Sequence, residues 1–163
     1  MKLLATIGIN IAAPMAGDAG GGAVFMTNAI LCLKEGGMQA KVQPQWFADC
    51  GIGFLKPTID LISPSVVVTL GERACKAMAA VYELPRMAFR AAVEMPEGLM
   101  LASGTRCFPM YHCGARILNT HRPMDAQLRD WQRVRRALGR AEPLNKSNSP
   151  TAMAIWTRLA RTV

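Results

Sequence analysis

The sequence predicts an α/β fold, a three-layer α/β/α sandwich with a mostly parallel central sheet. Apolar stretches typical of strands alternate with amphipathic stretches typical of helices, an order that favours parallel strands joined by helices. The clearest strand, SVVVTL (65–70), passes through Gly71 directly into a helix. The chain has 163 residues, 51% hydrophobic and 18% charged, which is enough for one domain with its own core.

Three segments are expected to form the parallel strands. Residues 23–33 (AVFMTNAILCL) follow a glycine run and are apolar almost throughout, which predicts a central strand buried on both faces. Residues 65–70 form the second strand, and residues 106–111 (RCFPMY) form the third.

Helices and turns are expected between these strands. Residues 3–13 resemble a short signal peptide, but Asn10 interrupts the apolar run, so we favour a buried strand or helix before the glycine-rich turn 17–22. Pro44 begins a helix that Pro57 must kink or split. A second helix covers residues 72–82, and residues 87–104 are expected to form short strands and turns.

The last third begins with a long helix from Pro123 to Leu138, ended by Gly139. Its expected inner stripe is Met124, Leu128, Trp131, Val134 and Leu138, and its expected outer face carries Arg129, Arg133, Arg136 and Arg140. Residues 141–150 look like a polar linker, followed by a short helix bearing Ile155, Trp156 and Leu159. The chain is therefore divided into a domain over residues 1–140 and a linker with a C-terminal helix over 141–163.

Positive charge is concentrated at the C-terminal end of the chain. Residues 1–105 are electrically balanced, and the whole net charge of +8 lies in residues 106–163. Such a concentration favours a polyanionic partner, although a solvated basic face is the simpler interpretation.

Composition also bears on the cellular compartment and on metal sites. Five cysteines at irregular spacing favour reduced thiols and a cytoplasmic protein, and no apolar stretch is long enough to span a bilayer. The spacing of Cys107, His112, Cys113 and His121 does not match a zinc site. Cys75 is expected in the core.

No P-loop, Gly-x-Ser-x-Gly elbow or G-x-G-x-x-G motif is present.

Each of the three predicted strands has a polar or turn-forming residue within it or directly after it. These are Asn28, Gly71 and His112, and ligands of parallel sheets bind beyond the carboxyl ends of the strands. A structural amide and a strand-capping histidine are the simpler interpretations of Asn28 and His112 taken singly. Together, on two strands of one sheet, they predict a binding site.

The sequence resembles the uracil-DNA glycosylase superfamily in three segments: VFMTNAILCLK (24–34), PSVVVTLGERA (64–74) and FPMYHCGARILN (108–119). The resemblance covers about residues 1–140 and is nearest to the bacterial and archaeal iron–sulfur branch. It implies that Asn28 binds the flipped base and that His112, as catalytic residue, donates to uracil O2 as the glycosidic bond breaks. It also implies that Gly71 lines the pocket and that residues 114–119 form a loop that probes the DNA.

The same resemblance implies how DNA is held. Arg116 would contact phosphate and Ile117 or Leu118 would act as the wedge, while Arg129, Arg133 and Arg136 would add phosphate contacts. The implied partner is uracil-containing DNA, bound by a monomer.

The sequence departs from the family pattern at its beginning. Residues 1–9 resemble the helix that follows the family's Gly-x-x-Pro-Gly loop, and residues 12–22 offer only Asp18 as a replacement carboxylate. We therefore expect that a late start codon or trimming has removed the first strand and this water-positioning loop. The 163-residue chain is then expected to be slow or inert, and the complete gene product active.

The cysteine pattern shows a parallel gap. Cys32 and Cys50 match two of the four iron–sulfur ligands of the family branch, while the earlier pair is absent. No cofactor is expected in this chain, and a [4Fe–4S] cluster requires two further cysteines from a longer N-terminus. The sequence thus favours a DNA repair glycosylase that removes uracil or a related deaminated base. The alternative is a noncatalytic DNA-binding module of the same fold.

Overall fold

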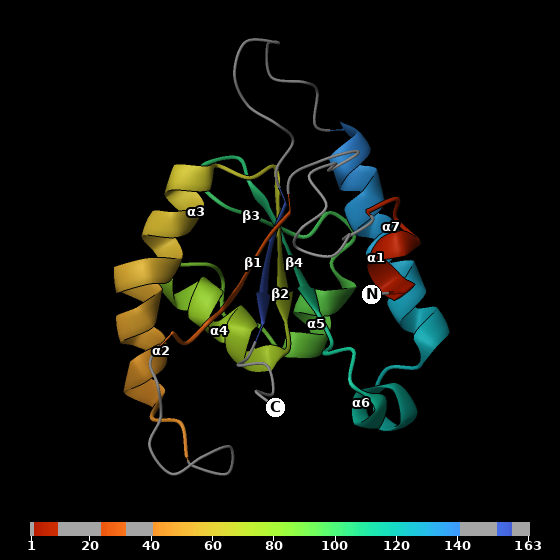
Figure 1. Cartoon of the computed structure of the whole chain (residues 1–163), viewed down its shortest axis with the longest axis horizontal. Helices are drawn as coiled ribbons and strands as arrows, with labels where there is room; N and C mark the ends of the chain where they lie inside the picture. Colours follow the sequence, from red (N-terminus) through yellow and green to blue (C-terminus); the bar gives the residue numbers. More distant parts are fainter. Residues whose placement is uncertain (1, 10–23, 32–40, 141–152, 158–163) are drawn as a thin grey trace, which may run out of the picture.

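The structure, a computed structural model, describes residues 2–9, 24–31, 41–140 and 153–157. These residues form a five-stranded sheet in the order β1-β5-β2-β4-β3 (Figure 1). β1, β5, β2 and β4 are parallel, and β3 runs antiparallel at the edge. The strands are β1 (Val24–Asn28), β2 (Val66–Leu70), β3 (Leu99–Met100), β4 (Arg106–Met110) and β5 (Met153–Thr157). The α/β fold with a mostly parallel sheet is confirmed.

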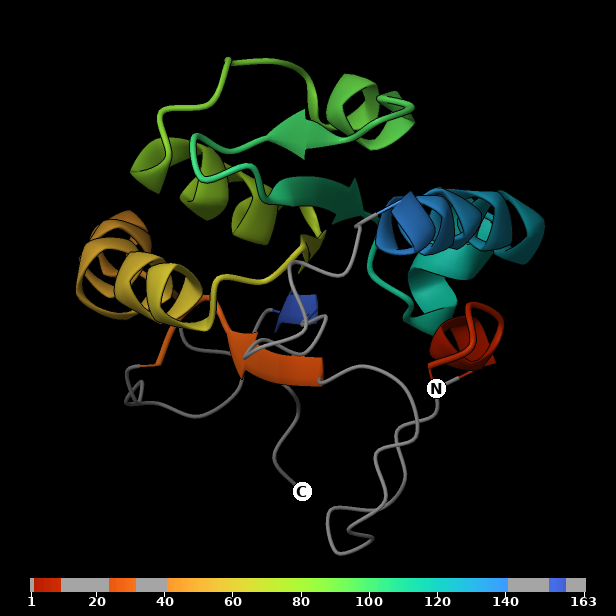
Figure 2. The same ribbon diagram turned by 90° about the horizontal axis from the view of Figure 1, so that it is seen from above.

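Helices cover both faces of this sheet, as the view from above shows (Figure 2). One core cluster joins α1 (Lys2–Ala5) and α7 (Met124–Arg140) to one face of β2 and β4. The second cluster lies on the opposite face, under α3 (Lys56–Ile62), α4 (Glu72–Val81) and α5 (Phe89–Glu94). Val66 and Val68 belong to the first cluster and Val67 to the second, the alternation expected of a strand buried on both sides. None of the helices in these described ranges is long and apolar enough to cross a bilayer.

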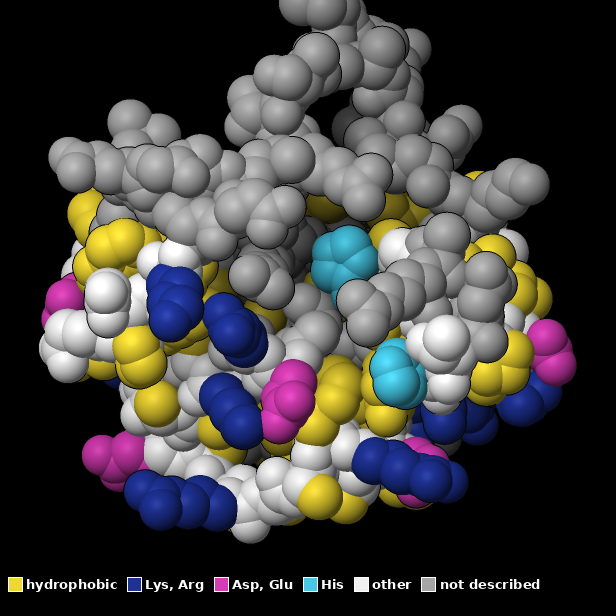
Figure 3. Space-filling view, turned by 90° about the horizontal axis from the view of Figure 1, so that it is seen from below, with side chains coloured by type: hydrophobic (Ala, Val, Ile, Leu, Met, Phe, Trp, Pro, Cys, Tyr) yellow, Lys and Arg dark blue, Asp and Glu magenta, His cyan; other side chains and the backbone are white. Residues whose placement is uncertain are grey.

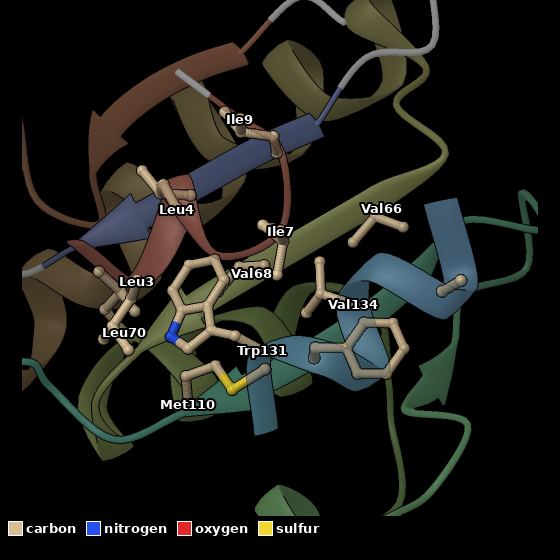
Figure 4. Packing of buried hydrophobic residues seen from close by; sticks show 12 residues of the cluster. Leu3, Leu4, Ile7, Ile9, Val66, Val68, Leu70, Met110, Trp131 and Val134 are labelled. Atoms are coloured by element: carbon tan, nitrogen blue, oxygen red, sulfur yellow. The ribbon is translucent and has the colours of Figure 1, made fainter. Parts of the chain in front are cut away.

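Trp131 is the largest side chain that joins α7 to the sheet. It is buried and lies among side chains of α1, β2 and β4 (Figure 4), including Leu3, Ile7, Val68 and Met110. Val134, one helical turn further on, is fully buried in the same cluster. Met124, in contrast, is exposed, so the expected inner stripe of α7 is wrong at its first residue.

The helix that begins at Pro44 is split, as the sequence predicts. α2 (Pro44–Cys50) passes through a π-helical turn, η1 (Gly51–Leu55), into α3. The Lys56 N–H donates to the Gly51 carbonyl, five residues back. Pro57 has no N–H to continue the α-helical pattern, so the wider turn absorbs the interruption.

Two segments differ from the sequence-based expectation. Within residues 87–104 the structure has the helix α5 in addition to the short strand β3. The family-like probing loop over residues 114–119 is the helix α6 (Ala115–Thr120), in which Gly114 precedes the first turn.

The predicted central position of the 23–33 strand is also wrong. β1 is at one edge of the described sheet, and its Phe25 and Met26 are 41% and 45% exposed. β5 lies between β1 and β2 and pairs with both in parallel register.

The short C-terminal helix expected to bear Ile155 and Trp156 is therefore wrong as well, because these residues lie in a strand. Short apolar runs suit either element, and neighbours decide between them. Leu159 and the linker 141–150 lie outside the described residues. The boundary at residue 140 stays a prediction, although β5 shows that the C-terminal part contributes to the sheet.

Candidate active site

The carboxyl ends of β1, β2 and β4 bring the three predicted site residues to one edge of the sheet. Asn28 is the last residue of β1, Gly71 follows β2, and His112 comes two residues after β4. Thr27 and Thr69 both pair with Trp156, and Leu70 pairs with Met110, so the three strands end at the same level. Figure 3 looks onto this edge, where histidine, Lys and Arg side chains lie beside hydrophobic ones.

Asn28 is half-buried and pairs with Thr157 across the β1–β5 ladder. Two strands, β5 and β2, separate it from β4. At about 4.8 Å for each strand spacing, the backbones of Asn28 and Met110 are about 14 Å apart. Side chains must therefore reach inward for Asn28 and His112 to bracket one pyrimidine, and their convergence to about 10 Å stays a prediction.

Gly71 forms the turn between β2 and α4 with φ +91° and ψ 160°, a conformation that L side chains rarely adopt. Its N–H donates to the Met110 carbonyl at 2.8 Å, and its carbonyl accepts from Cys75 at 3.1 Å. A Cβ at this position would meet no atom within 4 Å. Gly71 thus joins the ends of β2 and β4 by a hydrogen bond and leaves open space beside its Cα.

His112 is exposed, and its ring has a defined hydrogen bond. The Gly114 N–H donates to His112 Nδ1 over 3.2 Å. A ring nitrogen that accepts a hydrogen bond carries no proton, so the neutral ring bears its proton on Nε2. His112 therefore presents an Nε2–H donor at the carboxyl edge of the sheet.

The predicted DNA-contact residues occupy different environments. Ile117 and Leu118 are half-buried on α6, and Arg129 and Arg136 are exposed on α7. The side chains of Arg116 and Arg140 are not among those that the structure describes.

Arg133 does not share the exposed face predicted for it. Its side chain is only 12% exposed, and its guanidinium donates to the Val93 carbonyl and to Asp130. The predicted exposure of Arg133 on the outer face of α7 is therefore wrong, because α5, a helix that the sequence did not predict, supplies a carbonyl that accepts from it. Its role as a DNA contact stays a prediction.

We expect the double substitution of Arg129→Gln and Arg136→Gln to weaken DNA binding equally for all sequences. The salt slope, log K against log salt concentration, should fall by about one unit for each lost phosphate contact. Filter binding or anisotropy over a salt series measures this slope. Lys76→Gln is the matched control, since Lys76 is an exposed cation on α4, on the opposite face of the sheet. An unchanged slope in the double variant would place the DNA surface elsewhere.

Asp130 and Arg122 are residues that the sequence analysis missed. Asp130 is buried and accepts from both Arg122 and Arg133. An Asp among the arginines of an amphipathic helix was the available signal, because a lone carboxylate beside several cations tends to be paired.

Three of the cysteines in the described part of the chain are buried and one is exposed. Cys50, Cys75 and Cys107 are buried, and burial raises the pKa of both Cys75 and Cys107. Cys113 is free and exposed, and Cys32 lies outside the described residues. No three His, Cys, Asp or Glu side chains in residues 2–9, 24–31, 41–140 and 153–157 gather as metal ligands.

A model of the uracil DNA glycosylase superfamily matches residues 2–136. The chain belongs to the uracil DNA glycosylase superfamily. The matched segment contains Asn28, Gly71 and His112, and it ends before β5. Comparisons with curated proteins and with solved structures found no match.

Members of the uracil DNA glycosylase superfamily act on DNA, and most are glycosylase hydrolases. Asn28 and His112 lie at the carboxyl ends of two strands of the sheet, and their roles in such a reaction stay predictions.

Proposed function

We propose that this protein is a DNA repair glycosylase that flips uracil, or a related deaminated base, out of DNA and hydrolyses its N-glycosidic bond. The observation that carries the proposal is the hydrogen bond from the Gly114 N–H to His112 Nδ1, which directs Nε2 outward as the donor, at the edge where Asn28 also ends its strand. Base flipping is expected of glycosylases as a class.

Asn28 is proposed to identify the base. An Asn amide offers an N–H donor for uracil O4 and an oxygen acceptor for N3–H. Cytosine presents the opposite pattern, a donor at the 4-amino group and an acceptor at N3. The wrong base therefore leaves buried polar groups unpaired, which is the costly outcome that produces strong discrimination.

His112 is proposed to stabilise the leaving group. As the glycosidic bond breaks, its electron pair passes to the base and negative charge accumulates on the uracil oxygens. A donor already fixed in place lowers the energy of this transition state more than that of the ground state. The water that then attacks C1′ needs a further group to hold it, and Asp18, the candidate from the sequence, lies outside the described residues.

Other features of the proposal depend on the sequence alone. The quoted motifs favour the iron–sulfur branch of the superfamily, but no step here uses a cluster. The free thiols of the described residues support a cytoplasmic protein, and we propose that it acts as a monomer.

A uracil-excision assay beside a gel-shift assay tests the function. The 163-residue protein and any longer in-frame product of its gene are incubated with duplex and single-stranded DNA that contain one uracil. Abasic product supports a glycosylase, and DNA binding without product by both forms supports the noncatalytic module instead.

We expect Asn28→Asp to weaken discrimination for uracil, because a carboxylate cannot donate to O4. Excision of uracil should fall by one to two orders of magnitude, the usual scale for leaving one buried polar group unpaired. Competition between uracil and cytosine oligonucleotides measures the change. Asn10→Asp and Asn145→Asp add the same charge elsewhere in the chain and serve as controls. Unchanged preference in Asn28→Asp would remove this residue from the base pocket.

A further inference from the structure

His112 lies in the segment from Tyr111 to Arg122, and side-chain contacts join the two ends of this segment. Tyr111 directly precedes His112, and Arg122 lies ten residues after it, beyond α6. The Arg122 guanidinium lies over the Tyr111 ring, 5.8 Å from its centroid, and Phe89 of α5 packs edge-on against the same ring at 5.0 Å. The two ends of the segment are therefore in contact, although α6 separates them along the chain.

Arg122 is held in place by a buried carboxylate. Its Nε and Nη2 donate to the two oxygens of Asp130 at 3.0 and 2.8 Å, a bidentate pair. The Asp130 side chain is 4% exposed and also accepts from Arg133, which in turn donates to carbonyls of Val93 and Met95. Asp130 hydrogen bonding raises the pKa of Arg122, whereas burial lowers the pKa of Arg133. The carboxylate thus connects the segment both to α7 and to the end of α5.

Gln127 makes the direct connection to the histidine. Its Nε2 lies 3.5 Å from the His112 carbonyl and 3.3 Å from the Arg122 carbonyl, so one amide bridges both ends of the segment. Gln127 is buried, and its Oε1 has no hydrogen-bond partner. A buried amide that leaves one oxygen unpaired contributes little to stability, which suits a residue retained for the position of the segment.

We infer that Arg122, Asp130 and Gln127 are positioning residues that hold His112 in the geometry needed to donate to the flipped base. They touch the two ends of the segment and not the ring, so they act through its backbone. The inference rests on the proposed function for its catalytic consequence. Its structural part is that Arg122, Asp130 and Gln127 control the orientation of the His112 ring, and this part depends only on the contacts described above.

Two variants test the inference. Arg122→Lys keeps the charge but removes the bidentate fork, and Gln127→Met keeps the volume while it removes both donors and the unpaired oxygen. Arg106→Lys is the matched control, because Arg106 pairs with Glu97 at 2.7 Å at the opposite end of β4. Circular dichroism establishes a temperature at which all variants are folded, so that the losses measured are not losses of fold.

Two readouts are needed for each variant. The first is functional: the single-turnover excision rate, measured together with the dissociation constant for uracil-containing DNA. The second is the ¹⁵N spectrum of the histidine rings, which contains only two residues, with His121→Gln to assign them. In the wild-type protein the spectrum should show His112 as the Nε2–H tautomer.

We expect Arg122→Lys and Gln127→Met to lower the excision rate about ten- to a hundredfold, the scale of a misplacement near 1 Å. DNA affinity should stay within about twofold, and the His112 ring should lose its single tautomer, which a general loss of stability would not cause. Arg106→Lys should change neither readout. Unaltered His112 signals in both variants, or an equal change in Arg106→Lys, would overturn the inference. If neither the 163-residue protein nor a longer in-frame product excises uracil, the proposed function fails, and the ring spectra still decide whether these residues position His112.

Discussion

His112→Ala should lower the rate of uracil excision about a hundred- to a thousandfold, the usual effect of removing one donor to a developing oxyanion. The structure supports this size of effect because the ring is already oriented. Gly114 holds Nδ1, so the donor at Nε2 needs no reorganisation as the bond breaks. DNA affinity should change little, since the exposed ring contributes no charge to phosphate binding when neutral.

Single-turnover kinetics with excess protein measures this loss, and anisotropy with the same oligonucleotide measures affinity. His121→Ala is the matched control, because His121 is also exposed but lies at the far end of α6. Full activity in His112→Ala, or the same loss in both variants, would show that another group stabilises the departing base.

Trp131→Ala should lower the free energy of unfolding by about 3–5 kcal/mol, the range for truncating a buried aromatic side chain. Trp131 is buried between α7 and the sheet and also contacts the α1 part of the same core cluster. Its loss leaves a cavity where three elements meet. A domain of this size is stable by only about 5–15 kcal/mol, so the variant should unfold at much lower urea concentration.

Urea denaturation followed by circular dichroism measures the change without depending on tryptophan fluorescence. Trp46→Ala is the comparison, because Trp46 is only half-buried on α2 and its truncation should cost clearly less. A loss below about 1 kcal/mol for Trp131→Ala would mean that α1 and α7 do not share one core.

The strand-end residues were predictable because their signals are local. The run from Ser65 to Leu70 is apolar and β-branched, and Gly71 can take the positive φ that the turn into α4 requires. The same local logic placed His112 after the third strand and the helix break at Pro57. Parallel strand order then brings such strand ends to one edge without further information.

The predictions of which elements lie next to each other in the sheet were wrong in two places. The apolar run 23–33 was assigned to the centre of the sheet, yet β1 lies at its edge. An apolar run with β-branched residues favours a buried strand, but it does not show which strands flank it. The segment 153–157 was assigned to a helix because its apolar residues also suit helical spacing, and only pairing with both β1 and β2 distinguishes the alternatives.

The arginines illustrate the same division for the candidate site. Helical periodicity places Arg129, Arg133 and Arg136 within one broad stripe, and two of the three are exposed as predicted. Arg133 is only 12% exposed because carbonyls at the end of α5, about forty residues earlier in the chain, lie against it. Periodicity contains no information about that contact.

Taken by itself, the sequence determined the fold class and the family resemblance. It also determined the strand that contains Asn28, the strand that precedes His112 and the conformational role of Gly71. All of these depend on residue type and short spacing. Only the tertiary structure decided that β5 enters the sheet beside β1, that Arg133 is a partner of the buried Asp130, and that Arg122 and Gln127 close the segment bearing His112. Those features depend on contacts between residues distant in the chain. Their free energy comes from burial and charge pairing that do not exist until the elements have packed.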